Sequence, residues 1–232
     1  VRDWHDASTY GTNLIDKVIP NRDFPFPKSL YAVEDTLRFY IADKKDALIV
    51  DFFSGSGTTL HAVNLLNAED NGHRRCIMVT NNEVSDREAK SLYKKGLHQG
   101  DSEWEKFGIA RYITWPRTVC TIEGHDSNGN PLNGNYLGSG FPMASGFKTN
   151  CEYFKLTFLD KTSIALGRQF RELFPVLWMK GGAIGRSPVL ESDELPNMLI
   201  LSQNKMAVLI DEIYYSEFDA EMQKHPEIRT VF

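Results

Sequence analysis

Cysteine is scarce in this 232-residue sequence, and long apolar runs are missing. The three cysteines, Cys76, Cys120 and Cys151, lie far apart, and no two of them form a C-x-x-C pair. This pattern excludes a disulfide framework and indicates reduced, buried thiols in a reducing cytoplasm. No apolar segment is long enough to cross a bilayer, and the first residues lack the composition of a signal peptide. We therefore expect no membrane partner.

Basic residues are also fewer than acidic ones. The 31 acidic residues outnumber the 26 basic ones, which gives a formal net charge of -5. A self-sufficient DNA-binding domain is more often basic, because neutralising phosphates supplies much of its affinity. Contacts with DNA are therefore expected on a local patch or in another part of the protein. The six histidines are scattered without the i, i+4 spacing of a zinc site.

The glycines are unevenly distributed and divide the chain. Many of the 17 glycines fall between residues 124 and 146, around the turn-forming segment Asp126-Ser-Asn-Gly-Asn-Pro131. We interpret residues 124–150 as a connector between a larger unit, residues 1–123, and a small α/β unit, residues 151–232. The first residue is Val1 rather than methionine, and residues 228–232 resemble an interrupted strand. These two features predict that the sequence is a segment of a longer chain.

The first half of the sequence predicts a β-α-β-α order. Ser29 is a candidate N-cap for a helix with one apolar stripe, and residues 48–50 form an apolar strand of the buried parallel kind. A helix over residues 58–67 and a second strand over 74–79 follow, and then a helix that opens with the capping box Ser85-x-x-Glu88. This order is typical of an α/β fold with a parallel sheet.

The second half predicts shorter elements. Ser102-x-x-Glu105 is a second capping box, with its helix running through Trp104 and Phe107. The other elements expected there are a strand over residues 153–158, a helix whose apolar stripe runs from Leu166 to Leu177, a β-hairpin of residues 198–201 and 206–210, and a short helix over residues 217–224.

A glycine loop, Asp51-Phe-Phe-Ser-Gly-Ser-Gly-Thr-Thr59, joins the first predicted strand to the following helix. Gly55 and Gly57 have no side chain to keep a ligand away from the backbone, and the start of a helix offers free N–H groups. No basic residue follows the glycines, which excludes the Gly-Lys-Ser/Thr loop of triphosphate-binding proteins. The alternative is an ordinary strand-to-helix turn without a ligand.

The residues around the two glycines favour a ligand. Asp51 closes the strand, where its carboxylate can accept hydrogen bonds from turn amides or reach an ammonium group of a ligand. Thr58 and Thr59 can cap the helix start, and Phe52 and Phe53 offer apolar surface for a flat purine ring. These features predict a nucleotide-like ligand at the loop.

Several segments together resemble β-class DNA methyltransferases. The order of Phe26-Pro-Lys-Ser-Leu30, a helix and the glycine loop is similar to that class, in which the cofactor motifs follow the catalytic block. Gly11-Thr-Asn13, Asn67-x-x-Asp70 and Arg74-Arg75 resemble the adenine-specific modification subunits of type III restriction-modification systems. The resemblance covers the first 85 residues well and the rest more loosely. It implies an incomplete Rossmann-like, S-adenosylmethionine-dependent methyltransferase fold.

The resemblance implies a cofactor, partners and a set of site residues. The cofactor is S-adenosyl-L-methionine, and the partners are double-stranded DNA and either a restriction subunit or a second copy of the chain. Thr12, Lys28 and Ser29 would contact the amino-acid end of the cofactor. The strand end that usually grips the ribose carries Thr80 in place of an acid, which leaves Asn81 and Glu83 as alternatives. The loop residues of the implied site are Asp51, Phe53, Ser54, Gly55, Ser56, Gly57 and Thr58.

The catalytic motif of the family is missing from this sequence. These enzymes flip the target base and hold its amino group against an Asp-Pro-Pro-Tyr motif, and no such tetrapeptide occurs here. We therefore expect no catalytic residue in the chain and no methyl transfer by the chain alone. A nicotinamide-dependent oxidoreductase fragment and a non-enzymatic assembly or DNA-positioning module with a vestigial pocket are the alternatives.

One further stretch has two interpretations. Arg111, Trp115 and Arg117 interleave basic and aromatic side chains, as nucleic-acid-binding segments do. The same spacing is also typical of a helix edge or strand that is partly buried.

Overall fold

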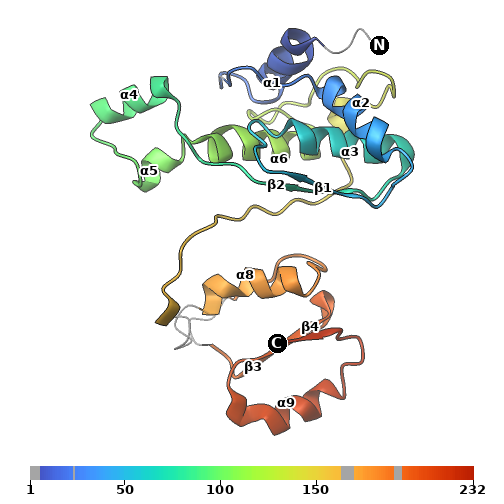
Figure 1. Cartoon of the computed structure of the whole chain (residues 1–232), viewed down its shortest axis with the longest axis vertical. Helices are drawn as coiled ribbons and strands as arrows, with labels where there is room; N and C mark the ends of the chain where they lie inside the picture. Colours follow the sequence, from blue (N-terminus) through green and yellow to red (C-terminus); the bar gives the residue numbers. More distant parts are fainter. Residues whose placement is uncertain (1–5, 23, 163–169, 191–194) are drawn as a thin grey trace. The chain divides into compact units, whose positions relative to one another are not determined.

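The computed structural model describes residues 6–22, 24–162, 170–190 and 195–232. The chain forms two compact units, the N-terminal unit Val1–Tyr153 and the C-terminal unit Phe154–Phe232. Figure 1 shows the helices and strands of each unit. Both units combine helices with a small sheet, so the predicted α/β class is confirmed.

The N-terminal unit begins with helices. A π-helical turn, η2 (Ser8–Thr12), continues into α1 (Asn13–Val18), and α2 (Leu30–Ile41) follows an irregular segment that contains Pro27. The hydroxyl of Ser29 accepts a hydrogen bond of 3.4 Å from the backbone N–H of Ala32, so Ser29 is the predicted N-cap of α2.

Two short parallel strands form the sheet of this unit. Strand β1 (Leu48–Asp51) pairs with β2 (Arg75–Met78), with Leu48 opposite Arg75 and Asp51 opposite Met78. Helix α3 (Thr58–Asp70) connects them, as the β-α-β order predicts. The parallel pairing is therefore confirmed, while the larger Rossmann-like sheet of the methyltransferases stays a prediction.

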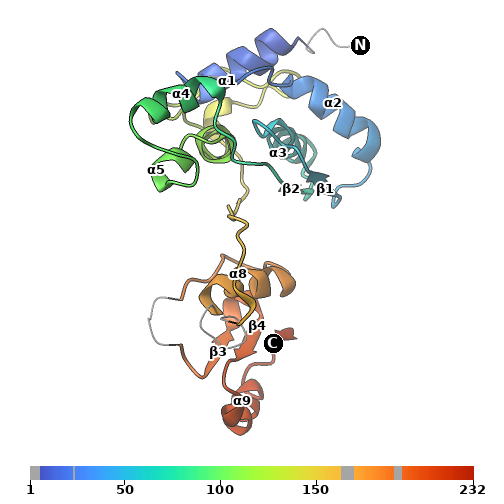
Figure 2. The same cartoon turned by 60° about the vertical axis from the view of Figure 1, so that its left-hand side comes forward.

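Helix α3 packs against the strand pair and against α2 (Figure 2). Every residue from Leu60 to Leu66 is buried, which is typical of a helix that is covered all round. The π-helical η3 (Ala110–Thr114) continues into α6 (Trp115–Glu123), which packs on α3 and α1. The core of the unit consists of Ile15, Val18, Ile19, Leu30, Tyr31, Ala62, Leu65, Ile113, Cys120, Leu132, Tyr136, Met143 and Phe147.

The glycine-rich segment differs from the expected connector. Leu132, Tyr136 and Phe147 are buried in the core of the N-terminal unit, and the compact unit extends to Tyr153. The physical reason is that apolar residues alternate with the glycines. A Cβ atom at Gly124 would lie 2.3 Å from the carbonyl oxygen of Ala144, so the glycine permits a close approach of two backbones.

Helices α4 (Asp86–Lys94) and α5 (Ser102–Glu105) lie to one side of the other helices of the N-terminal unit (Figure 1). Ser85 caps α4 as predicted, because its hydroxyl accepts a hydrogen bond from the N–H of Glu88. The prediction of a second capping box, which begins at Ser102, is wrong. Asp101, not Ser102, is the N-cap of α5, and this helix ends after four residues, before Phe107.

The C-terminal unit packs α8 (Phe170–Lys180) against a three-stranded sheet. The predicted hairpin is confirmed: β3 (Met198–Leu201) and β4 (Met206–Leu209) are antiparallel, joined by the 3-10 turn η5 (Ser202–Asn204). Strand β5 (Thr230–Val231) pairs in parallel with β4. The turn η6 (Glu212–Tyr214) leads into α9 (Tyr215–Met222), near the helix expected over residues 217–224. Phe174, Trp178, Met206 and Val208 form the core.

The strand expected over residues 153–158 is wrong. The segment has no strand, and the side chains of Leu156 and Phe158 are almost fully exposed. The alternating pattern has no partner strand to pair with, so it does not produce a sheet. The apolar stripe expected from Leu166 is only partly described, because Leu166 lies outside the described residues.

Candidate functional site

The glycine loop lies at the carboxyl end of the parallel strand pair, between β1 and α3. The N–H of Ser54 donates a hydrogen bond of 3.1 Å to the carbonyl of Val79, which ties the loop to the end of β2. Gly55 and Gly57 have φ values of 49° and 80°. Side chains other than that of glycine are strained in this left-handed region, so the two glycines are what allows the turn.

The carboxylate of Asp51 holds the loop together. One oxygen accepts a hydrogen bond of 3.1 Å from the N–H of Phe53, and the other accepts one of 2.5 Å from the hydroxyl of Thr59. The N–H of Gly57 donates to the carbonyl of Ser54 at 2.8 Å. The prediction that Asp51 accepts from a turn amide is confirmed, and its contact with a ligand stays a prediction.

Two backbone donors of the loop are unused. Within the described part of the chain, the N–H groups of Gly55 and Ser56 donate no hydrogen bond. The first N–H groups of α3, beginning at Thr58, also have no intrahelical acceptor, as at the start of any α-helix. These donors and the positive end of the helix dipole have the polarity that a negatively charged group requires.

The residues of η3 and α6 hold the opposite side of the loop. The hydroxyl of Thr114 donates a short hydrogen bond to the carbonyl of Gly55. Arg117 donates from one nitrogen to the carbonyl of Ser56 at 3.2 Å, to its hydroxyl at 3.0 Å and to the hydroxyl of Thr58 at 2.9 Å. The hydroxyl of Ser54 is buried without a partner among the described residues. The loop is therefore fixed from behind, by side chains that come from a later part of the chain.

A buried polar chain continues from Arg117 into the core. The second terminal nitrogen of Arg117 lies 3.4 Å from Nδ1 of His61, and Nε2 of His61 lies 2.8 Å from the hydroxyl of Tyr136. Burial lowers the pKa of Arg117 to about 10, so the guanidinium remains charged at neutral pH. Burial, followed by the nearby Arg117 cation, lowers the pKa of His61 well below its usual value, which keeps the imidazole neutral.

Sequence reasoning missed these supporting residues. Arg117 is one of the three residues whose spacing suggested nucleic-acid binding, but its side chain is buried, so the partly buried helix is the correct interpretation for it. No local pattern links Arg117 to Ser56, because they lie 61 residues apart in the sequence.

The segments predicted to contact the amino-acid end of the cofactor lie next to one another. A Cβ atom at Gly11 would be 2.6 Å from the carbonyl oxygen of Pro27, so the Gly-Thr and Pro-Lys-Ser segments are in direct backbone contact. Thr12 and Lys28 are exposed, while Ser29 is buried as the N-cap of α2. The ring of Phe24 lies 3.2 Å from the position of a Cβ atom at Gly55, which brings this segment to the glycine loop.

The two alternatives for the ribose contact are paired with each other. The side-chain amide of Asn81 donates a hydrogen bond of 3.2 Å to the carboxylate of Glu83, and both residues are exposed just beyond β2. Such a pair presents a carboxylate with a fixed orientation at the strand end. The ribose contact stays a prediction for both residues.

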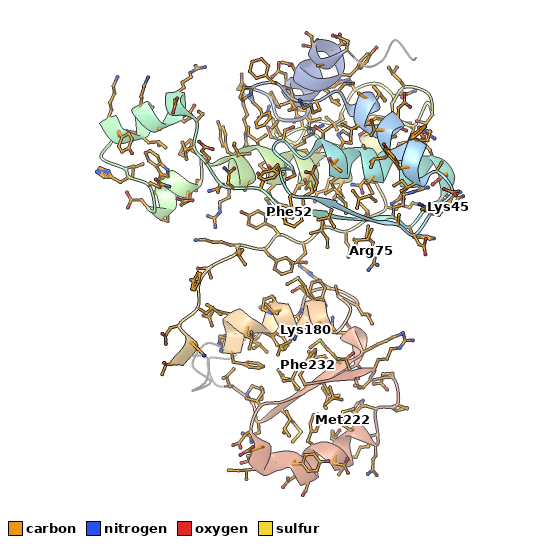
Figure 3. The ribbon with its side chains drawn as sticks, in the orientation of Figure 1. Lys45, Phe52, Arg75, Lys180, Met222 and Phe232 are labelled. Carbon is orange, nitrogen blue, oxygen red and sulfur yellow. The ribbon has the colours of Figure 1, made fainter. Side chains whose placement is uncertain are left out.

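One face of the strand pair is partly exposed and mostly apolar. Leu48 and Val50 of β1 lie beside Arg75 and Ile77 of β2 on this face, and the three aliphatic side chains are each about half exposed, at 47–50%. In Figure 3 the side chains of Phe52 and Arg75 point away from α3. This exposure contradicts the prediction of a buried parallel strand, because among the described residues the helices that pack on the pair, α3 and its neighbours, cover one side of it.

Other kinds of site receive no support from the described residues. A surface cavity of about 430 Å³ lies along α2 and does not include the glycine loop; it is lined by Ala32, Asp35, Thr36, Phe39 and Tyr40. In the described ranges, no group of three or more histidine, cysteine, aspartate or glutamate side chains is placed to hold a metal ion. No helix there has both the length and the apolarity of a membrane span.

Comparisons with known proteins identify relatives for part of the chain. No protein-family model matches it. Type II methyltransferase M.KpnI of Klebsiella pneumoniae is 42% identical over 99 residues, and the Mod subunit of the type III restriction-modification enzyme EcoPI of Escherichia phage P1 is 34% identical over 90 residues. The StyLTI Mod subunit of Salmonella typhimurium is 35% identical over 89 residues.

These matches cover 41%, 39% and 33% of this chain, respectively. They cover 23%, 14% and 13% of the three relatives, so the chain spans less than a quarter of the length of the relatives it matches. Identities of this size over about 90 residues confirm the predicted resemblance. The chain is thus related to type II methyltransferases and to the Mod subunits of type III restriction-modification enzymes.

Proposed function

We propose that this chain is the S-adenosyl-L-methionine-binding portion of a cytoplasmic DNA methyltransferase that methylates the exocyclic amino group of adenine. One observation supports this above the others: the unused N–H groups of Gly55 and Ser56, at the carboxyl end of a parallel strand pair, in a chain related to methyltransferases. A ligand with a carboxylate and a purine ring suits these donors and the exposed ring of Phe53.

Different residues of the chain would contact different parts of the methyl donor. The loop amides would take the carboxylate, with Thr12 and Lys28 beside the same end of the ligand. Asn81 or Glu83 would hold the ribose hydroxyls, since both lie just beyond β2. When bound, S-adenosyl-L-methionine supplies an activated methyl group. Holding that group in line with a target amine is worth several kcal/mol of the activation barrier.

The Asp-Pro-Pro-Tyr motif, which holds the target amino group in these enzymes, is absent from this sequence. Without this motif we expect the chain by itself to bind the cofactor without transferring the methyl group. DNA and a restriction subunit would be partners of the longer protein.

Calorimetric titration with S-adenosylhomocysteine tests the proposal, because this product analogue keeps the adenosine and the carboxylate and is chemically stable. Phe53→Ala should weaken binding about three- to tenfold, the range expected for loss of one aromatic contact. Phe39→Ala is the matched control: Phe39 is 83% exposed, compared with 94% for Phe53, but it lies on α2. Both changes remove little buried surface, so neither should alter folding.

Three outcomes distinguish the alternatives. Absence of any binding heat together with self-association would favour a non-enzymatic assembly module. Heat from NAD and none from S-adenosylhomocysteine would favour an oxidoreductase fragment. Transfer of tritiated methyl groups to DNA by residues 1–232 alone would overturn the expectation that the chain is inactive by itself.

A further inference from the structure

Arg117 is a buried cation without an acidic partner. Its side chain is 1% exposed, and it forms no ion pair in the described part of the chain. Its hydrogen bonds are to neutral groups: one carbonyl, two hydroxyls and a neutral imidazole. Its Nε atom has no hydrogen-bond partner among the described residues. Burying an uncompensated charge is costly, so a purely structural role would be served better by an uncharged side chain of similar volume.

The position of the guanidinium relates it to the unused donors of the glycine loop. Thr114 holds the carbonyl of Gly55 on the α6 side. In a planar trans peptide the C=O and N–H bonds point in opposite directions, so the N–H of Ser56, in the same peptide, points away from α6. Arg117 is therefore on one side of a single layer of backbone, and the unused N–H of Ser56 is directed to the other side.

Three features of the loop and its surroundings contribute positive electrostatic potential. The N–H of Ser56, the start of α3 and the guanidinium of Arg117 all place positive charge at this point of the loop. Helix α3 is 13 residues long, so its dipole is well developed. A buried charge acts through little water and is therefore weakly screened by salt.

We propose that Arg117 is a positioning residue that selects ligands with a carboxylate group on the outer side of the glycine loop, without touching them. This inference rests on the proposed function and extends it. It assigns recognition of the amino-acid end to a charge behind the loop. The bound carboxylate is then the missing counter-charge of the buried guanidinium.

The test compares two ligands and two variants by calorimetry. S-adenosylhomocysteine has the carboxylate, and 5′-methylthioadenosine is a similar nucleoside thioether without the amino-acid end. Arg117→Met removes the charge and keeps most of the volume, whereas Arg117→Lys keeps the charge. For a charge acting over one layer of backbone, Arg117→Met should weaken S-adenosylhomocysteine binding about ten- to hundredfold. It should leave 5′-methylthioadenosine within about twofold, and Arg117→Lys should keep most of the preference.

The outcomes separate this inference from the proposed function. Equal weakening of both ligands by Arg117→Met would mean that Arg117 only supports the loop, and the inference would be wrong while the proposed function stands. The inference would also be wrong if the wild-type chain bound both ligands equally well, a comparison that needs no variant and holds even if Arg117→Met does not fold. If the wild-type chain binds neither ligand, both the proposed function and this inference fail.

Discussion

We expect Glu34 to make the stability of the N-terminal unit depend on pH. Its side chain is fully buried on α2, where it shares the guanidinium of Arg38 with Glu69 of α3. Burial raises the pKa of Glu34 to about 7, the Glu69 carboxylate adds to the effect, and Arg38 opposes it. One oxygen of Glu34 has no hydrogen-bond partner among the described residues, as suits a carboxyl group that is protonated near neutral pH.

The magnitude follows from the shift. A rise in the pKa of Glu34 from the usual 4.5 to about 7 corresponds to about 3 kcal/mol of differential stability between its protonated and charged forms. The native state binds the proton more tightly than the unfolded state. Stability from this group is therefore fully present below about pH 4.5, and it is lost as the pH rises through about 7. Glu34→Gln mimics the protonated form and should remove most of this loss.

We expect Glu34→Gln to raise the free energy of unfolding by up to about 3 kcal/mol at pH 8 and to change it little at pH 4.5. Urea denaturation followed by tryptophan fluorescence measures this. A Trp178→Phe background removes the tryptophan of the C-terminal unit, so that the signal reports the N-terminal unit. Glu152→Gln, the same chemical change at an exposed position, is the control. If Glu34→Gln is less stable than the wild type at pH 8, the ion pair with Arg38 outweighs burial and the reasoning is wrong.

Three further predictions concern folding and are measured by urea denaturation. Gly146→Ala should destabilise the chain by about 3 kcal/mol or more, because the new Cβ atom would lie 2.1 Å from the carbonyl oxygen of Ile122. Gly129 also has a positive φ, but a Cβ atom there would have nothing within 4 Å, so Gly129→Ala should cost only about 1–2 kcal/mol. Equal losses in the two variants would contradict the packing argument. Ser29→Ala should cost about 1 kcal/mol through loss of the cap of α2, and no change would show that the cap is dispensable. Phe174→Ala should cost about 3–5 kcal/mol in the transition of the C-terminal unit alone, and a matching shift in the N-terminal unit would contradict the division into two units.

Local signals in the sequence were enough to predict the elements around the glycine loop. The caps Ser29 and Ser85 mark where α2 and α4 begin, and in both cases the hydroxyl bonds the N–H group three residues later. The apolar run before Asp51 and the glycines after it predict the strand, the turn and the helix in the correct order. These features depend on neighbours within a few residues, which a sequence pattern records.

Features that depend on distant contacts could not be predicted in this way. The partners of Arg117 come from residues about 60 positions earlier, and Tyr136 reaches His61 across 75 positions. The segment over residues 153–158 has the alternation of a strand, but a strand also needs a partner edge, which the pattern does not supply. The apolar strand at Leu48 predicts burial, yet burial depends on what covers both faces of the sheet.

The partly exposed face of the strand pair has a consequence for mutational experiments on this chain. Val50 and Ile77 are each about half exposed, so replacing either by a polar residue removes less buried surface than at a fully buried strand position, and an assay that scores only folding would rank both positions as comparatively tolerant. Large aliphatic side chains side by side on a parallel pair are nevertheless typical of surfaces that another layer covers. If such a layer covers this face, an assay that scores association would rank the same positions as intolerant, and equal rankings in the two assays would contradict it.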